Sequence, residues 1–208
     1  MTFTFIGLGN PGDEYAQTRH NTGRIILEHF RVAHDFPEWK KDVKSQSLVS
    51  KGKIVDGKTT HTVTLVCPET FMNKSGISAK AFVGNVKEGG AAVAKAAERM
   101  LVVYDDLDLP FGTMKFSFNR SSGGHKGVES IIKAVKTEAF PRLRIGIAPT
   151  TPSGKMKKPH GGEVVEKVIL GEFKATELAE LKKMTKKINE GLEIFIHDGR
   201  ERAMTFLN

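Results

Sequence analysis

The chain has 208 residues, of which 39% are hydrophobic and 27% charged, and no apolar run is long enough to form a membrane-spanning helix. These proportions exclude disordered, fibrous and membrane-spanning classes and favour a single globular domain over residues 1–208. The 32 Lys and Arg residues exceed the 24 Asp and Glu residues by 8, which favours a polyanionic partner such as nucleic acid. Cys67 is the only cysteine, and the N-terminus lacks the basic and apolar regions of a secretory signal, so we expect a cytoplasmic protein.

Segments with a strand pattern alternate along the chain with segments of helical spacing. Strands are predicted over residues 3–8, 62–66, 101–104, 114–118 and 143–147. Helices are predicted after Thr22, after Ser75, over residues 91–99 and 127–135, and from Ala175 to the C-terminal end. This alternation predicts an α/β fold. The lysines of the last segment are expected on its solvated face.

Two further patterns concern a loop and the aromatic residues. Residues 149–162 are rich in Pro, Gly and Lys, which predicts a basic, flexible loop. Phe3 and Phe5, like Phe116 and Phe118, alternate with polar residues. Burial on one face of a strand is the favoured interpretation of that spacing, and base stacking is the weaker alternative.

A dinucleotide-binding pattern occurs in the Gly-rich segment over residues 7–12, directly after the first predicted strand. In that motif the last glycines already lie in a helix, whereas here apolar helical spacing resumes only at Ile25. We therefore favour a tight loop that leaves the Asn10 amide exposed at the end of a strand. Dinucleotide binding remains a minor alternative.

Residues 52–59 match a phosphate-binding loop, but a strand pattern follows where a helix is required. The pair Asp56-Gly57 indicates a hairpin turn instead. The seven histidines and Cys67 include no paired zinc spacing, so we expect no metal, and no Gly-x-Ser-x-Gly motif points to a serine nucleophile. Water is the candidate nucleophile.

Four polar clusters lie at the ends of predicted elements. They cover residues 9–12 with Tyr15, 18–21, 70–73 and 104–108, the last directly beyond an apolar strand. Active sites of α/β sheets form where strands end, and a histidine, an aspartate and amides are a workable hydrolytic set. Each of these residues could equally cap a helix or bond local backbone, and both interpretations stay open.

Five blocks, in this order, resemble bacterial-type peptidyl-tRNA hydrolases: GLGNPGDEYAQTRHNTG, PETFMNKSG, VVYDDLDLPFG, SSGGHKGVESI and FPRLRIGI. The resemblance implies a single-domain twisted mixed β-sheet flanked by helices. It also implies hydrolysis of the ester that joins a peptide to the 3′ ribose of tRNA, which recycles prematurely released peptidyl-tRNA. We expect a monomer that needs no cofactor, metal or membrane. A noncatalytic RNA-binding relative of the same fold is the alternative.

The resemblance also assigns residues to roles. His20 matches the catalytic base, and Asp105 matches the carboxylate that orients it. The residues expected to bind substrate or tRNA are Asn10, Tyr15, Phe71, Met72, Asn73, Lys115, His125, Lys126 and Arg144. Among them, Asn10 and Asn73 match amides around substrate and water, Phe71 and Met72 would line the groove, and Tyr15 matches a residue near the tRNA terminus.

The outer contacts are expected to be basic. Arg144 matches a residue near the tRNA 5′ phosphate, and Lys115 with the lysines of the 149–162 loop would add sequence-independent attraction to the backbone.

The sequence departs from the family pattern at three places. His125-Lys126-Gly127 replaces the common His-Asn-Gly, so an ammonium stands where an amide is usual; the alternative is that Lys126 begins a helix and points into solvent. Ser117 occupies a position that is often basic, and residues 84–99 form a longer connection than usual.

Overall fold

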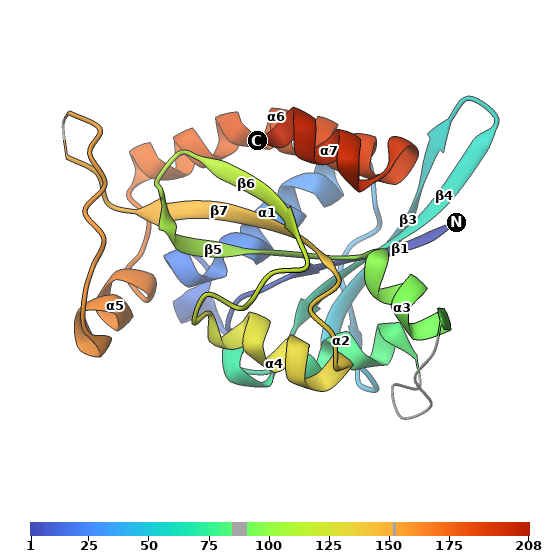
Figure 1. The fold of residues 1–208 in the computed structure, drawn as a ribbon, viewed down its shortest axis with the longest axis horizontal. Coiled ribbons are helices and arrows are strands. Elements are labelled where there is room, and N and C mark those ends of the chain that lie inside the picture. Colours follow the sequence, from blue (N-terminus) through green and yellow to red (C-terminus); the bar gives the residue numbers. More distant parts are fainter. Residues whose placement is uncertain (85–90, 152) are drawn as a thin grey trace.

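The computed structural model describes residues 1–84, 91–151 and 153–208, through which one mixed sheet runs. Its seven strands lie in the order β2-β3-β4-β1-β5-β7-β6 (Figure 1). The central strands β4, β1, β5 and β7 are parallel, whereas β2, β3 and β6 join in antiparallel pairs. The strands are β1 (Thr2–Gly7), β2 (Lys40–Asp42), β3 (Ser47–Asp56), β4 (Thr59–Pro68), β5 (Met100–Pro110), β6 (Met114–Phe118) and β7 (Pro141–Ala148).

Helices cover both faces of the sheet and enclose two apolar cores (Figure 1). On one face lie α1 (Thr22–Ala33), α6 (Ala175–Asp198) and α7 (Arg200–Leu207). On the other face lie α2 (Gly76–Val83), α3 (Ala91–Glu98) and α4 (Lys126–Val135). The remaining helix α5 (Gly162–Ile169) has no buried residue and lies at one end of the sheet. The 3₁₀ turns are η1 (Asp13–Tyr15), η2 (Arg19–Asn21) and η3 (Met72–Lys74).

The α/β class and the mixed sheet are confirmed, and all five predicted strands are present. The hairpin turn is also confirmed, because Asp56 pairs with Thr59 and Gly57 has a φ of 53°. Phe3, Phe5 and Phe116 are buried as predicted, whereas Phe118, at the end of β6, is only partly buried.

Other elements differ from the prediction. The sequence patterns did not reveal β2, β3 or α5, and the C-terminal helix is interrupted at Gly199, whose φ is 92°. Residues 104–108 lie within β5 rather than beyond it. The helix predicted over residues 91–99 is present as α3, whereas residues 85–90 of the longer connection lie outside the described part of the chain.

Glycines allow two helix N-termini to approach the end of β1 closely. A Cβ at Gly23 would lie 2.2 Å from the carbonyl oxygen of Val103 and 2.4 Å from the nitrogen of Leu8. A Cβ at Gly127 would lie 2.5 Å from the sulfur of Met72. Because both positions lack a side chain, α1 and α4 bring the residues that precede them to the same point of the sheet.

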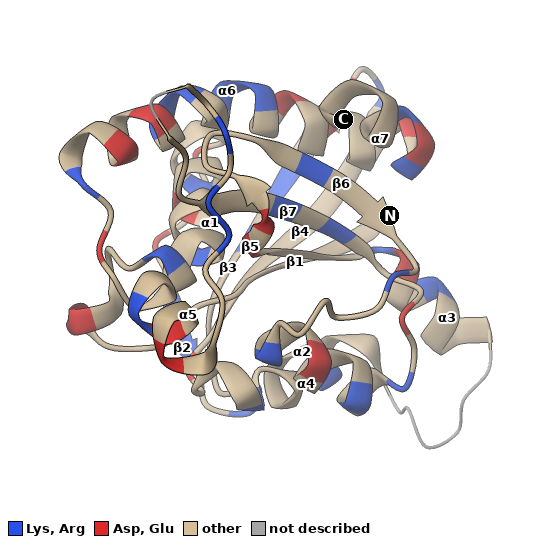
Figure 2. Cartoon of the chain, turned by 60° about the vertical axis from the view of Figure 1, so that its left-hand side comes forward, with Lys and Arg blue, Asp and Glu red and all other residues tan. Residues whose placement is uncertain are grey.

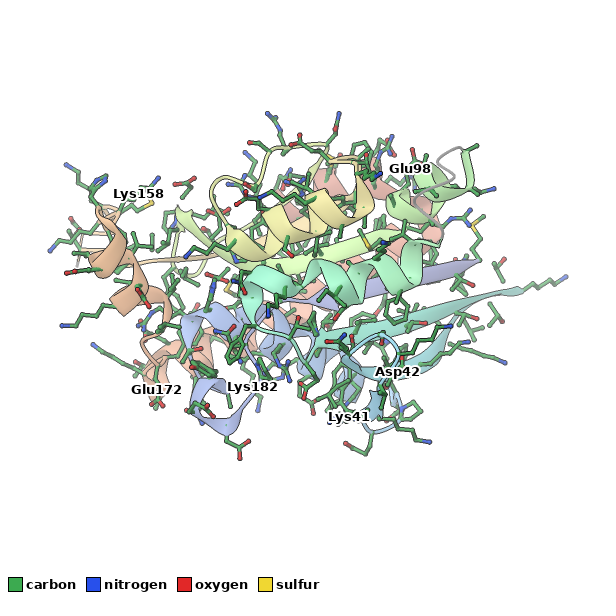
Figure 3. All side chains as sticks on the ribbon, turned by 90° about the horizontal axis from the view of Figure 1, so that it is seen from below. Lys41, Asp42, Glu98, Lys158, Glu172 and Lys182 are labelled. Atoms are coloured by element: carbon green, nitrogen blue, oxygen red, sulfur yellow. The ribbon has the colours of Figure 1, made fainter. Side chains whose placement is uncertain are left out.

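The predicted basic loop contains a local turn. Thr150 and Met156 form an antiparallel bridge, and Lys158 forms an ion pair with Asp108 of β5 (Figure 3 labels Lys158). The flexibility of this loop stays a prediction. Within the described ranges, no helix is long and apolar enough to cross a membrane.

Candidate active site

Three side chains from distant parts of the chain meet near the end of β1. His20 lies in η2, Asp105 lies in β5, and His125 precedes α4 as its N-cap. Asp105 still pairs with Ile145 of β7 on one side, whereas β1 ends on the other side opposite Val103. The end of β1 leaves room for His20 to reach the carboxylate, which is only 2% exposed.

Hydrogen bonds assign a different role to each histidine. His20 Nδ1 lies 3.0 Å from both carboxylate oxygens of Asp105 and donates to them, which makes Nε2 the basic nitrogen of that ring. His125 Nδ1 accepts from the Val128 N–H at 3.3 Å, so its Nε2 carries the proton and donates to Asp105 Oδ1 at 3.1 Å. Asp105 therefore accepts from both rings, and His20 alone has its second nitrogen available for proton transfer.

The pKa values of the pair are shifted by burial and by charge. Burial alone would raise the pKa of Asp105, but the two histidines outweigh it and hold that pKa below its ordinary range. For His20, burial and the nearby Lys126 lower the pKa, but the charge and hydrogen bonds of Asp105 outweigh them and raise it above 6.5. The site thus holds a carboxylate anion beside an imidazole of increased basicity.

A metal ion is a possible occupant that the sequence spacing did not indicate. Potential ligand atoms of His20, Asp105 and His125 lie within 4.8 Å of one another. If His125 Nε2 bound a metal, its Nδ1 would carry the proton and would face the Val128 N–H donor. The contact with Val128 therefore fits two histidines donating to one carboxylate better than it fits a metal centre.

Three contacts fix Asn10, which lies in the loop after β1. Its side-chain oxygen accepts from the Met72 N–H at 2.9 Å. Asn21 holds its backbone on both sides: Asn21 Oδ1 accepts from the Asn10 N–H at 2.8 Å, and Asn21 Nδ2 donates to the Asn10 carbonyl at 2.9 Å. The expectation of an exposed Asn10 amide is wrong, because η3 packs over the loop and Asn10 is only 8% exposed.

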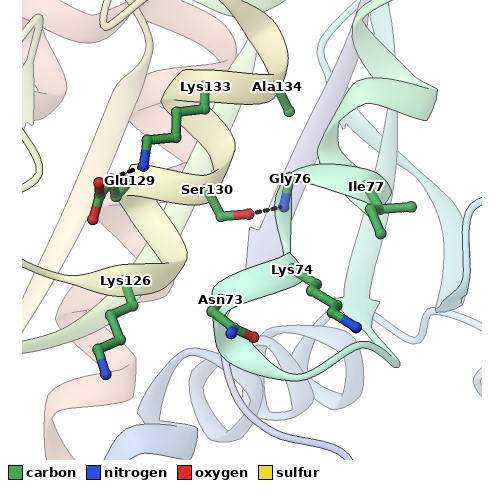
Figure 4. A pocket seen from close by; sticks show the side chains of 9 residues that line it. All are labelled: Asn73, Lys74, Gly76, Ile77, Lys126, Glu129, Ser130, Lys133 and Ala134. Atoms are coloured by element: carbon green, nitrogen blue, oxygen red, sulfur yellow. Dashed lines mark hydrogen bonds and ion pairs between the residues drawn. The ribbon is translucent and has the colours of Figure 1, made fainter.

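A groove of about 540 Å³ runs between η3, α2 and α4 (Figure 4). Asn73 and Lys126 line it at one end, and Lys126 is the exposed first residue of α4. Phe71 is 58% exposed beside η3, whereas Met72 is buried in the core that α2 and α4 share with the sheet. Contrary to the expectation for Met72, its side chain does not reach the groove surface.

The remaining predicted residues lie around this centre. Tyr15 is half-buried in η1. Lys115 and Arg144 are direct partners in the pairing of β6 with β7, and Figure 2 shows basic residues on both strands. Arg144 donates from Nε to Asp106 at 2.5 Å, and Lys115 is exposed. The structure thus places both on one face of the sheet, Arg144 on the strand next to β5 and Lys115 on the edge strand.

Sequence reasoning assigned no individual role to two residues that support the site, Asn21 of the 18–21 cluster and Arg142. Asn21 follows His20 directly in the TRHN block, and this adjacency was the available signal. Arg142 is completely buried, donates to the Ser121 carbonyl at 2.8 Å and lies 4.5 Å from the Phe140 ring centroid. It thereby supports the loop that leads to His125, but its position inside an apolar strand gave no signal in the sequence.

Comparison with known proteins gives consistent matches. A family model described as peptidyl-tRNA hydrolase matches residues 4–208. A peptidyl-tRNA hydrolase from Aquifex aeolicus is 41% identical over 207 residues, covering 98% of this chain and 94% of the relative. One from Herpetosiphon aurantiacus is 38% identical over 206 residues, covering 99% and 90%. The crystal structure of peptidyl-tRNA hydrolase from Acinetobacter baumannii matches with a TM-score of 0.81 and 28% identity, covering 100% of this chain and 94% of that one.

These matches extend over nearly the whole chain, so they confirm the resemblance seen in the five sequence blocks. The TM-score of 0.81 shows that the solved relative shares the fold of this chain. The expectation of an enzyme is confirmed at the level of the family, whose named members are hydrolases. The chain belongs to the peptidyl-tRNA hydrolase family.

Proposed function

We propose that this chain hydrolyses the ester bond between a peptide and the 3′ ribose of tRNA, with water as the nucleophile and His20 as the general base. The observation that carries the proposal is the pair of bonds from His20 Nδ1 to Asp105, which directs the basic Nε2 away from the carboxylate. A surface that only binds RNA has no chemical need for an imidazole oriented in this way.

The reaction follows from this orientation. As water attacks the ester carbonyl, its proton moves to His20 Nε2, and the Asp105 anion stabilises the imidazolium that forms. The carbonyl oxygen becomes an oxyanion, to which the Asn73 side-chain amide donates. When the tetrahedral intermediate collapses, the ribose 3′ oxygen leaves and takes the proton from the imidazolium. The products are a free peptide and an intact tRNA, and His20 is neutral again.

Contacts around the centre would hold the two parts of the substrate. Asn10 contributes its Nδ2, because its Oδ1 already accepts from Met72. Phe71 would offer its exposed ring to the peptide, and Tyr15 would contact the tRNA terminus. Lys115 and Arg144 would attract phosphates, which positions the tRNA without reading its sequence.

The decisive experiment compares the wild-type protein with His20→Ala on a short acylated-aminoacyl-tRNA, scored for released peptide and intact tRNA. We expect kcat to fall by about 10²–10⁴-fold in the variant because the base is lost. Binding of an uncleavable aminoacyl-tRNA analogue should stay nearly unchanged, because affinity depends on the basic surface.

Three outcomes would contradict parts of the proposal. A variant that retains most of the wild-type kcat would reject His20 as the base. A wild-type protein that binds the analogue but releases no peptide would indicate the noncatalytic RNA-binding alternative. The contact of His125 with Val128 supports a metal-free mechanism, so turnover should persist after dialysis against EDTA. If dialysis abolished turnover and a divalent metal restored it, the metal-free mechanism would be wrong.

A further inference from the structure

The Arg19 side chain connects the turn that carries His20 to a segment about 150 residues further along the chain. Its Nη1 donates to the carbonyl oxygens of Gly171 at 3.2 Å and Glu172 at 2.7 Å. Its Nη2 donates to both carboxylate oxygens of Glu177, at 2.9 and 2.8 Å. We call the side-chain contacts among Arg19, Gly171, Glu172 and Glu177 the Arg19 latch.

Backbone pairing strengthens this connection. The Arg19 N–H donates to the Gly171 carbonyl at 3.0 Å, and the Phe173 N–H donates to the Gln17 carbonyl at 2.9 Å. Thr18 and Glu172 form an antiparallel bridge between these bonds. The guanidinium also lies 5.2 Å from the centroid of the Phe173 ring. The segment just before α6 therefore holds both the backbone and the side chain of Arg19.

The latch matters because η2 is a single 3₁₀ turn of three residues. Such a turn has poor hydrogen-bond geometry and little stability of its own, so external contacts must fix its position. His20 follows Arg19 directly, and its ring must stay within hydrogen-bond distance of Asp105 for Nε2 to be oriented. Asn21 fixes the other end of η2 through its bonds to Asn10.

We propose that Arg19 is a positioning residue, and that its latch to residues 171–177 sets the orientation of the His20 ring. The catalytic consequence rests on the proposed ester hydrolysis, whereas the structural consequence does not. Arginine is suited to this position because the N–H bonds of its two Nη groups lie in one plane, so that Nη2 reaches both oxygens of the carboxylate while Nη1 reaches the two carbonyls. A lysine ammonium is a point charge and cannot hold all four acceptors in this geometry.

The best test variant is Glu177→Gln, because it weakens the latch without removing the start of α6. Glu177 Oε2 also accepts from the Lys174 N–H at 2.7 Å, at the start of α6. The glutamine oxygen keeps that acceptor, but the side chain loses its charge and one acceptor for Arg19. Arg19→Lys is the second variant, which keeps the positive charge and loses the planar fork.

Glu28→Gln is the matched control. Glu28 accepts from Arg31 Nε at 2.8 Å and Nη2 at 2.9 Å within α1, so the control removes the same charge from a similar pair that does not touch η2. Three quantities are measured for all variants. They are the midpoint of the NMR titration of the His20 ring, kcat for hydrolysis, and the Kd of the uncleavable tRNA analogue. The groups that face His20 are Asp105, His125 and Lys126, and none is altered.

In both test variants we expect kcat to fall by about 10–100-fold with unchanged Kd, as a small displacement of a catalytic group does. The His20 midpoint should fall below the wild-type value as its bonds to Asp105 loosen, whereas the control should match wild type in all three quantities. If both test variants keep the His20 titration midpoint and the kcat of the wild-type protein, the proposal is wrong. If the wild-type protein shows no hydrolysis but the midpoint still falls, the proposed function fails and the positioning role stands.

Discussion

At the residue scale, Asp105 is a shared acceptor for two histidines, which donate to it from different ring nitrogens. A buried carboxylate needs donors to offset its loss of hydration, and the two N–H groups supply them. The second ring nitrogen of His125, Nδ1, accepts a hydrogen bond from the Val128 N–H. In the proposed mechanism the second nitrogen of His20 takes the proton from water, so that of the two histidines bound to Asp105 one is the base and the other a support.

The raised pKa of His20 predicts how activity depends on pH. The base works only when neutral, so kcat/KM should fall as pH is lowered through the pKa of His20, with a midpoint above 6.5. A pH–rate profile on the acylated-aminoacyl-tRNA, with chemistry as the slow step, measures this limb. A profile that is flat across the histidine range would contradict the mechanism.

Asp105→Asn tests the cause of that shift. Without the anion, the burial that lowers the pKa of His20 is no longer offset, so the limb should move to lower pH. The maximal rate should also drop by about 10²–10⁴-fold, because the imidazolium loses its stabilising charge. An unchanged limb in this variant would mean that a different group controls the rate.

The sequence could indicate the reactive residues but not what holds them. His20, Asp105, Asn10 and Asn73 were found because each lies in a block with recognisable spacing. The contacts that hold them join segments far apart, such as Met72 to Asn10 across 62 positions. Such pairings depend on how the chain folds, so no local pattern carries them.

At the scale of elements, the sequence predicted those strands whose apolar runs enter a core. β3 was not recognised because Lys51, Gly52 and Lys53 interrupt its pattern near the edge of the sheet. The helix α5 was not recognised because it is only 8 residues long and directly follows the Pro- and Gly-rich loop. The break at Gly199 was missed because apolar spacing continues across it into α7.

The close approach of α1 to the sheet leads to a prediction for Gly23→Ala. The added Cβ would meet backbone atoms of Val103 and Leu8, neither of which can rotate away, so α1 must shift. We expect a loss of about 1–3 kcal/mol in the free energy of unfolding, measured in urea, as for other overpacked positions. The turnover number should fall as well, because η2 leads directly into α1.

Gly162→Ala serves as the matched control for stability. Gly162 is the first residue of α5, and nothing lies within 4 Å of a Cβ built there. Its free energy of unfolding should stay equal to wild type or rise by up to about 1 kcal/mol. If Gly23→Ala were as stable as this control, the packing of α1 would tolerate a side chain and the argument from close approach would fail.

At the scale of the whole molecule, the chain carries a net charge of +8, but some of the basic side chains near the site already pair with carboxylates. Arg144 pairs with Asp106, and Lys158 pairs with Asp108. A phosphate that binds to either group must compete with a carboxylate, which reduces the gain from that contact. Among the lysines that line the groove between α2 and α4, Lys133 pairs with Glu129, whereas Lys126, at the same end as Asn73, forms no ion pair within the described part of the chain.

Lys126→Asn therefore tests how the basic surface reaches substrate. If the ammonium contacts a phosphate of the bound acceptor end, the variant should reduce the magnitude of the slope of log affinity against log salt by about 0.7–0.9, the increment for one phosphate. The turnover number should change little, because His20 and Asp105 remain. Salt titrations with the uncleavable tRNA analogue measure the slope. The control variant is Lys58→Asn, which removes one positive charge from the turn between β3 and β4. Equal slopes for the two variants would mean that Lys126 points into solvent from the start of α4 and adds only to the general charge.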